Sequence, residues 1–511
     1  MSGINNLTLA KNLTARVRLV CSGLEAGQGE MLNRVTDITG ELLRWWFQQE
    51  YVETRDINFH EGQKQAILNT IYAHEVLGVK TLGELYTAVA PDVLLASDRA
   101  AQTVMTKKNA WPKYCMKMAT GTGKTWVLQA LMIWQVLNAN RQPENNRFTK
   151  NFLMVAPGLI VYDRLLDAFM GKERGGQRNF EDSDLKKFEQ LFIPESYRDE
   201  VFRFVQGAVC AKEYIGRKVT SGGLIAISNW HILSDEGEEL EADMVSAPGA
   251  DRNPAEVVAD LLPLMPGTNQ GNDLNQLNRK FERGSILQHL KELPSLMVFN
   301  DEAHHIHDFK VEGEVSEVEW QKSLNLIAEA KGGQFFQVDF SATPYNQVGT
   351  GKNRKLTYFP HIIVDFDLKT AMRQGLVKSL VLDKRKEIGA LSDEELEFKA
   401  YRDENGNPCL AEGQRIMLRA GLAKLKKLEL EFATIDPARH PKMLVMCEDT
   451  SVTPLVNEFL RLERLNDDEI LRVDSSKKGE LKESDWSVLH EKLFDMDAHK
   501  NPRVVVSVLM L

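Results

Sequence analysis

The sequence predicts an α/β protein of two doubly wound parallel-sheet domains, the second incomplete, with a helical amino-terminal extension. Short, nearly continuous apolar runs recur along the chain, as in parallel strands that are covered on both faces. Each run is followed by glycine or small polar residues and then by a helical pattern, so strand, loop and helix alternate. With 511 residues, the chain is also too long for one ordinary core.

The apolar pattern divides the chain into three parts. Residues 1–55 are expected to be helical, with an apolar face that includes Trp45 and Trp46. The first domain is expected over 56–350, with strands at 114–118, 151–156, 224–228, 295–300 and 335–340. Its periodicity fades at about 234–284, where Pro, Gly, Asn and Asp are frequent and an inserted surface region is expected. The second domain is expected over 360–511, with strands at 379–383, 442–447, 470–474 and 503–511.

Composition excludes several classes of protein. No apolar run approaches the roughly 20 residues that a bilayer span needs, and the amino terminus lacks the pattern of a secretory signal, so a cytoplasmic location without membrane contact is expected. The five cysteines include no CxxC pair, which argues against a zinc cluster and a disulfide framework. The net charge of −10 gives no global attraction to nucleic acid, although local surfaces can still be basic.

The stretch MATGTGKT, residues 118–125, follows an apolar strand and precedes a helical pattern, which is the setting of a phosphate-binding loop. Glycines at 121 and 123 let the backbone approach phosphate oxygens, with N–H groups and a helix N-terminus facing the anion. Lys124 then reaches the terminal phosphates and Thr125 ligates Mg²⁺. The general pattern has glycine where this chain has Met118, and a chance turn is the alternative.

A second apolar run ends in the acids that such a loop requires. In SLMVFNDEAH, residues 295–304, Asp301 is placed to hold Mg²⁺, and Glu302 is placed to orient and deprotonate the attacking water. Lys124, Asp301 and Glu302 are therefore the candidate catalytic residues. The neighbouring His304, His305 and His307 could form a transition-metal site, but their spacing fits neither a helical ligand pair nor a complete ligand set.

With the motifs NFHEGQKQAI, MATGTGKT, VAPGLIVYDRL, NDEAHH, FSATPY and DLKTAMRQGLVK, the chain resembles DEAD/DEAH-box helicases of superfamily two. It most resembles the restriction (Res) subunit of type III restriction-modification enzymes, from about residue 58 to the end. The resemblance implies two RecA-like domains, ATP and Mg²⁺, a motor on duplex DNA, and a methyltransferase subunit that reads the target sequence.

The resemblance also implies site residues. The nucleotide-binding set is Phe59, Gln63, Thr120, Gly121, Thr122, Gly123, Lys124 and Thr125, with Gln63 and Phe59 next to the adenine. The residues that couple hydrolysis to domain closure are His304, Ser341 and Thr343. The nucleic-acid contacts are Pro157, Gly158, Arg164, Asn229, Asp449 and Thr450.

In the family, a strand like RVVVSVLML leads on to an arginine-containing motif, an arginine finger and a nuclease, whereas this sequence ends at Leu511. The sequence is therefore expected to be an amino-terminal portion of a longer protein, and little hydrolysis is expected without the arginine finger. The stretch DEELEFK, residues 393–399, is interpreted as a charged helix and not as a nuclease site.

Three functions are compatible with these motifs. The first is an ATP-dependent DNA translocase or helicase. The second is an RNA helicase, because the core motifs do not distinguish DNA from RNA. The third is an ATP-gated scaffold without motor activity.

Overall fold

The computed structural model describes residues 7–174, 177–218, 220, 222–229, 285–305, 309–311, 314–316, 319–348, 355–378, 392, 399–403, 407–473 and 496–508. The chain forms two compact units, Met1–Lys378 and Ser379–Leu511. The predicted inserted region at 234–284 and the predicted strand at 379–383 lie outside the described residues, as does most of the predicted charged helix at 393–399.

The first unit is built on a seven-stranded sheet in the order β13-β1-β10-β7-β2-β6-β5. All six neighbouring pairs are parallel, which confirms the predicted class of fold. The strands are β1 (Lys113–Met118), β2 (Asn151–Ala156), β5 (Val209–Ala211), β6 (Leu224–Asn229), β7 (Leu296–Asn300), β10 (Phe335–Ser341) and β13 (Ile362–Phe366). The five strands expected from the sequence are present to within one residue at each end, while β5 and β13 were not expected.

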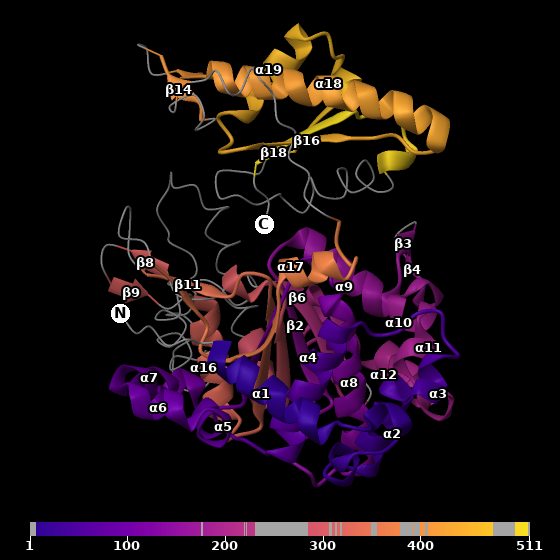
Figure 1. Ribbon diagram of the computed structural model, residues 1–511, viewed down its shortest axis with the longest axis vertical. Coiled ribbons are helices and arrows are strands. Elements are labelled where there is room, and N and C mark those ends of the chain that lie inside the picture. The colour runs from indigo at the N-terminus through magenta and orange to yellow at the C-terminus, as the bar shows by residue number, and fades with distance from the viewer. Residues whose placement is uncertain are drawn as a thin grey trace, which may run out of the picture. The chain divides into compact units, whose positions relative to one another are not determined.

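Side chains of each strand alternate between two hydrophobic cores. In β2, Phe152 and Met154 belong to one core and Leu153 and Val155 to the other. Figure 1 shows α8, α9 and α12 on one side of the strands and α16 on the opposite side. These helices span Lys124–Arg141 (α8), Leu159–Met170 (α9), Arg198–Ala208 (α12) and Glu319–Ala330 (α16). The sheet is therefore covered on both faces, which explains why its strands are apolar on both sides.

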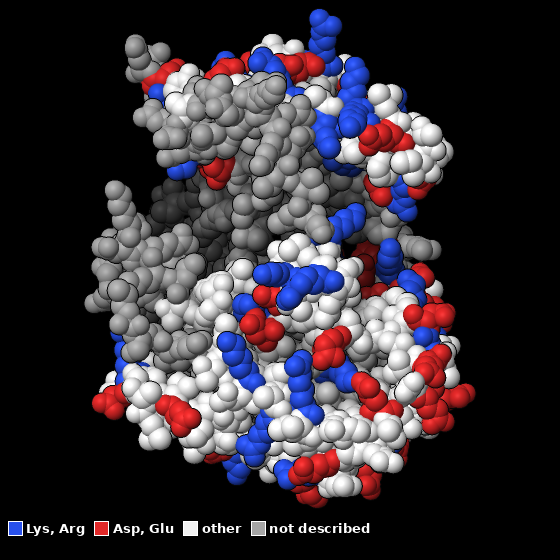
Figure 2. Space-filling model, in the orientation of Figure 1, with Lys and Arg blue, Asp and Glu red and all other residues white. Residues whose placement is uncertain are grey.

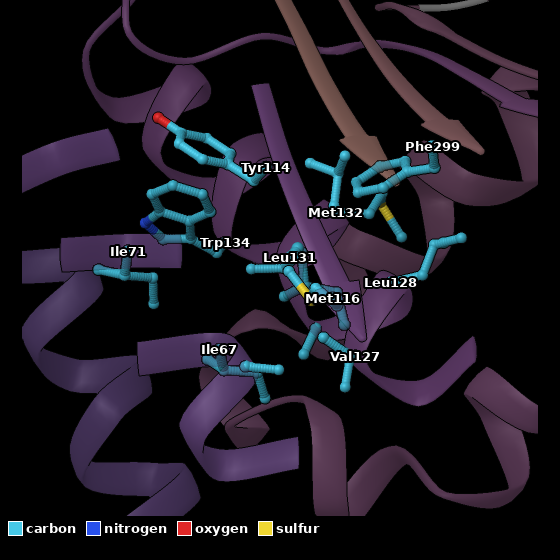
Figure 3. Packing of buried hydrophobic residues seen from close by; sticks show 14 of the residues in the cluster. Ile67, Ile71, Tyr114, Met116, Val127, Leu128, Leu131, Met132, Trp134 and Phe299 are labelled. Carbon is cyan, nitrogen blue, oxygen red and sulfur yellow. The ribbon is translucent and has the colours of Figure 1, made fainter. Parts of the chain in front are cut away.

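Helix α8 is the central helix of the larger core. Its residues from Val127 to Ala139 are all buried, so the helix is covered around its whole circumference instead of along one stripe. Figure 3 shows Leu131 of this helix packed in the same cluster as Met116 of β1 and Ile67 of α4. Because α8 begins at Lys124, this packing fixes the direction in which the phosphate loop leaves the sheet.

The expected amino-terminal extension is an integral part of the first unit. Its helices are α1 (Leu7–Val20), α2 (Asp37–Phe47) and α3 (Gln49–Val52), and α4 (Glu61–Ile71) follows. Asn69 of α4 donates hydrogen bonds to Thr14 Oγ1 (3.0 Å) and to the carbonyl oxygen of Ile363 in β13 (2.7 Å), which joins α1 and α4 to the edge strand. Residues 7–55 therefore complete the core instead of forming a separate domain.

The boundary between the units also differs from the expected one near residue 360. Strand β13 pairs with β1, and α17 (Leu368–Arg373) follows it, so residues up to Lys378 belong to the first unit. The other short elements of this unit are α5 (Leu82–Val89), α6 (Pro91–Ala96), α7 (Asp98–Val104), α10 (Asp184–Lys187), α11 (Glu189–Phe192), β3 (Glu173–Arg174), β4 (Gln177–Arg178), β8 (Phe309–Val311), β9 (Glu314–Ser316), β11 (Tyr345–Val348) and β12 (Lys355–Tyr358).

The second unit contains a three-stranded parallel sheet in the order β16-β18-β17. Its elements are β14 (Tyr401–Arg402), β15 (Pro408–Cys409), α18 (Glu412–Ile435), β16 (Met443–Cys447), α19 (Thr453–Leu462), β17 (Ile470–Val473) and β18 (Val504–Val508). Leu418 and Leu425 of α18 pack with Val456 and Leu460 of α19 over β18. The expected strands at 442–447, 470–474 and 503–511 are confirmed for the described residues.

In the larger core of the first unit, His74 is buried among aromatic side chains, and its imidazole stays neutral. Its Nε2–H donates to the carbonyl oxygen of Arg147 (2.6 Å), and the Tyr114 hydroxyl donates to its Nδ1 (3.4 Å). Burial lowers the pKa of His74 to about 4, and the bond to the Arg147 carbonyl only partly opposes this shift. In an unfolded chain the pKa is about 6.5.

We therefore expect the free energy of unfolding of the first unit to fall as the pH drops from about 6.5 towards 4. In that window the unfolded chain binds a proton that the folded chain does not, at a full cost of roughly 3 kcal/mol. His74→Gln keeps a donor near the Arg147 carbonyl but does not titrate. The thermal midpoint, measured between pH 7.5 and 4.5, should fall more steeply for the wild type than for this variant. If the thermal midpoints of the two proteins fell equally with pH, the assignment of a neutral His74 in the folded state would be contradicted.

Candidate nucleotide site at the carboxyl edge of the sheet

The predicted phosphate loop connects β1 to α8 and has the backbone that its glycines were expected to provide. Gly121 and Gly123 have φ values of +80° and +70°, in the left-handed region that favours glycine. A Cβ atom on Gly123 would lie 2.5 Å from Nε2 of Gln63. The loop is closed by the hydroxyl of Thr122, which donates to the carbonyl oxygen of Ala119 at 2.6 Å. Thr120 lies exposed within it, and Thr125 is half-buried in the first turn of α8.

The predicted acidic turn begins directly after β7. The Asp301 N–H donates to the carbonyl oxygen of Val155 (2.9 Å), and the Glu302 N–H donates to Asp301 Oδ1 (3.0 Å). Glu302 has a φ of +46°, an uncommon backbone conformation for a residue with a side chain. Such conformations cost on the order of 1–3 kcal/mol and are found mostly where the surrounding structure requires them.

The loop and the turn meet across the end of β10. Lys124 Nζ is in direct contact with Glu302 Oε1 and lies 3.9 Å from Asp301 Oδ1. Burial raises the pKa of the Asp301 carboxyl above its usual range, while the charge of Lys124 opposes the rise. The structure thus brings together the three candidate catalytic residues, although 178 positions of sequence separate Lys124 from Glu302.

The expected coupling residues are also adjacent. His304 Nδ1 and Ser341 Oγ are hydrogen-bonded at 3.0 Å, and the same ring nitrogen lies 3.5 Å from Glu302 Oε2. The Thr343 N–H donates to Ser341 Oγ at 3.0 Å. A continuous set of polar contacts therefore runs from Glu302 through His304 to the chain that follows β10, as the coupling role requires. The role itself stays a prediction.

The adenine-reading role of Phe59 and Gln63 stays a prediction, and the structure shows what the two side chains contact. The Phe59 ring is 9% exposed and packs against Trp46, Phe47 and Phe192, so it belongs to the core. Gln63 Oε1 accepts from the His60 N–H (3.1 Å), and Gln63 Nε2 donates to the carbonyl oxygen of Gly123 (3.1 Å). Gln63 thus holds the phosphate loop, and both of its polar atoms are occupied by the chain itself.

The donor set at the loop fits a magnesium ion bound together with a nucleotide. Asp301 and Glu302 bring two carboxylates against one ammonium group, so negative charge remains for a cation. Mg²⁺ takes one or two carboxylates, substrate phosphates and several waters, and so needs no cage of protein ligands. In the described part of the chain, no group of three or more His, Cys, Asp or Glu residues could hold a metal by itself. His307 and the side chain of His305 lie outside what the structure describes.

Four of the predicted nucleic-acid residues belong to the first unit. Pro157 and Gly158 follow β2, and Asn229 ends β6 in register with Ala156, so these three share the carboxyl edge with the acids. Arg164 is exposed on α9, and its charge opposes the rise that burial causes in the pKa of Asp301.

The other two belong to the second unit. Asp449 Oδ1 accepts from the Ser451 N–H (2.7 Å) and hydroxyl (2.5 Å), which shapes the turn that contains Thr450. Asp449 therefore has a local structural task, and Thr450 is exposed beside it.

Two sets of residues at the site escaped sequence reasoning. One is His60, at the start of α4. The other is a buried polar cluster behind the acidic turn, in which Asp339 of β10 accepts from Asn300 Nδ2 (2.7 Å) and His361 Nε2 (2.7 Å). Asn300 and Asp339 interrupt otherwise apolar strands, and that interruption was the available signal, because buried polar residues require partners.

The family match of one segment supports a helicase-like ATPase domain in the first unit. Residues 56–217 match the family described as type III restriction enzyme, res subunit, which confirms the resemblance for that segment. No curated protein matches the chain. Among solved structures, a variant of Dbp5 from S. cerevisiae bound to RNA and ADP BeF3 is similar over 87% of this chain and 74% of its own, with 11% identity and a TM-score of 0.32.

We expect Gly123→Ala to abolish nucleotide binding, because the new Cβ would meet Gln63 and would occupy a left-handed backbone. Gly332 offers a matched control, since its φ is +57° and nothing lies within 4 Å of a Cβ there. Gly332→Ala shares the backbone cost but should keep its affinity for ATP. Calorimetric titration with ATP and Mg²⁺ measures both. Wild-type affinity in Gly123→Ala would contradict the loop assignment.

Proposed function

We propose that this protein is the ATP-driven motor of a type III restriction-like defence system and moves along duplex DNA. The observation that carries the proposal is the contact of Lys124 with Glu302 and Asp301 at the mouth of the phosphate loop. It is supported by the family match over residues 56–217. The proposal includes a cytoplasmic location, where ATP and unprotected DNA meet, and a methyltransferase partner that reads the target sequence.

In this mechanism, the loop N–H groups and the N-terminus of α8 bind the phosphates of ATP. Lys124 exchanges its carboxylate partners for the terminal phosphate oxygens, and the two acids are then available. Asp301 and Thr125 would hold Mg²⁺, which neutralises charge on the phosphates. Glu302 orients water and accepts its proton, after the contact with Lys124 that it makes in the nucleotide-free protein has been released.

The proposal assigns DNA contact to the carboxyl edge of the first unit's sheet. Although the net charge is −10, this edge carries exposed Lys369, Arg373 and Lys378 on and after α17, without an acid in that helix. Figure 2 shows Lys and Arg side chains gathered over α17, whereas both signs are mixed on the lower part of the visible face. Lysine and arginine at such an edge neutralise phosphates without reading sequence.

ATP turnover with duplex DNA, single-stranded DNA and RNA separates the functions compatible with the motifs. Duplex DNA should stimulate turnover most. Glu302→Gln should bind ATP but lose roughly 10²–10⁴-fold in hydrolysis, because it cannot accept a proton. Lys124→Ala should lose binding itself. Stimulation by RNA alone would favour an RNA helicase, and ATP binding with an equal response to every polymer would favour a scaffold.

Removing charge from the carboxyl edge should weaken DNA binding in a salt-dependent way. The double variant Lys369→Ala, Arg373→Ala should reduce the slope of log affinity against log salt by about 1–2. The matched control is Arg99→Ala, Lys107→Ala, which removes the same charge from exposed positions that precede β1 and so lie towards the opposite edge. Fluorescence anisotropy with a DNA duplex at several salt concentrations measures the slopes. Equal slopes for the two variants would exclude this edge as the contact surface.

A further inference from the structure

The imidazole of His60 bridges the start of α4 and the phosphate loop. Its Nδ1 accepts from the N–H groups of Gly62 (3.0 Å) and Gln63 (3.4 Å), which caps the helix. Its Nε2 lies 2.8 Å from the carbonyl oxygen of Thr122. Because Nδ1 accepts, the proton of the neutral ring is on Nε2, and the ring donates to Thr122. The His60 side chain therefore both caps the N-terminus of α4 and holds the phosphate loop.

The ring is fixed by its surroundings as well as by its hydrogen bonds. It stacks on Phe366, with 5.2 Å between ring centroids and 29° between planes. A Cβ atom on Gly62 would lie 2.6 Å from the Phe366 ring, so that ring packs closely against the first turn of α4. The carbonyl oxygen of Phe366 accepts from the Ala119 N–H at 3.0 Å. The last residue of β13 thus positions both the imidazole and the start of the loop.

Holding the Thr122 carbonyl determines where the next amide points. In a planar trans peptide, the C=O and N–H groups point in opposite directions, and the peptide between Thr122 and Gly123 is trans. With its carbonyl directed at His60, the peptide turns the Gly123 N–H away from α4. Gln63 acts in the same way on the Gly123 carbonyl and hence on the N–H of Lys124. These two N–H groups are donors for a bound phosphate at the helix N-terminus.

We propose that His60 is a positioning residue for nucleotide binding, which orients the Gly123 N–H towards phosphate by holding the Thr122 carbonyl. The inference rests on the proposed function and extends it to a residue outside the phosphate loop. Only the neutral ring can both cap α4 and hold the Thr122 carbonyl, since protonation at Nδ1 would remove the helix cap. Burial lowers the pKa of His60, against opposing effects of the Thr122 carbonyl and Glu61, so the ring is neutral at pH 7.

Two substitutions separate the bridge from the cap. In His60→Asn the side-chain oxygen can take the place of Nδ1 and cap α4, but no donor reaches Thr122. In His60→Gln the side-chain amide can take the place of Nε2 and keep the bridge, while the cap is weakened. We expect His60→Asn to lose about 3–10-fold in affinity for ATP and ADP, the worth of one hydrogen bond. His60→Gln should bind both within about 2-fold of the wild type but unfold at a lower temperature.

The control is Thr81→Ala, which removes the N-cap of α5, where Thr81 Oγ1 accepts from the Glu84 N–H at 3.1 Å. It lowers the temperature of unfolding, because a helix loses its cap, without contact with the loop. Titration calorimetry with ATP and ADP and thermal unfolding are measured for all four proteins. Wild-type affinity in His60→Asn, or an equal loss in both His60 variants, would overturn the inference while the proposed function stands. If the wild type binds neither nucleotide, the proposed function fails and the inference with it.

Discussion

The contact between Lys124 and the pair Asp301 and Glu302 is the constraint on which the site depends. These three side chains are only 10–22% exposed, and charges that leave water need partners of opposite sign. Strands β1 and β7 are separated by β10 alone, so the loop and the acids start roughly 10 Å apart. The side chains of Lys124 and Glu302 together are long enough to cross that distance. Ser341, which ends the strand between them, bonds to His304 and so joins the same group of polar residues.

The polar cluster behind this contact gives the acidic turn a rigid base. Asp339 is fully buried and accepts hydrogen bonds from Asn300, Gln337 and His361. Asn300 immediately precedes Asp301, so a bond between β7 and β10 fixes the strand at the point where the turn begins. A buried carboxylate is costly unless its donors are present, and here they come from neighbouring strands. Part of the core of this largely apolar sheet therefore consists of polar side chains, which orient the acidic turn instead of contributing hydrophobic packing.

The features that depend on a short stretch of sequence were predicted well. Apolar runs located five strands of the first unit, glycines at 121 and 123 located the loop, and acids at the end of β7 located its partners. Prediction failed where a residue's role depends on distant contacts. β13 joins β1 although about 240 residues separate them in sequence, so its short run was assigned to the second domain. The packing of the Phe59 ring in the core was also not predicted, because it depends on contacts with residues distant in sequence. His60 gave no signal because its partner Thr122 lies 62 positions away.

The bond from the Ala119 N–H to the Phe366 carbonyl also bears on how the protein is made. A chain emerging from the ribosome contains the whole phosphate loop by residue 125, but the strand that anchors it is complete only at residue 366. At 5–20 residues per second, that delay is roughly 10–50 seconds. Throughout that interval the nascent chain has the loop without its anchor, so we expect the proposed binding of ATP to assist folding only after β13 has joined β1.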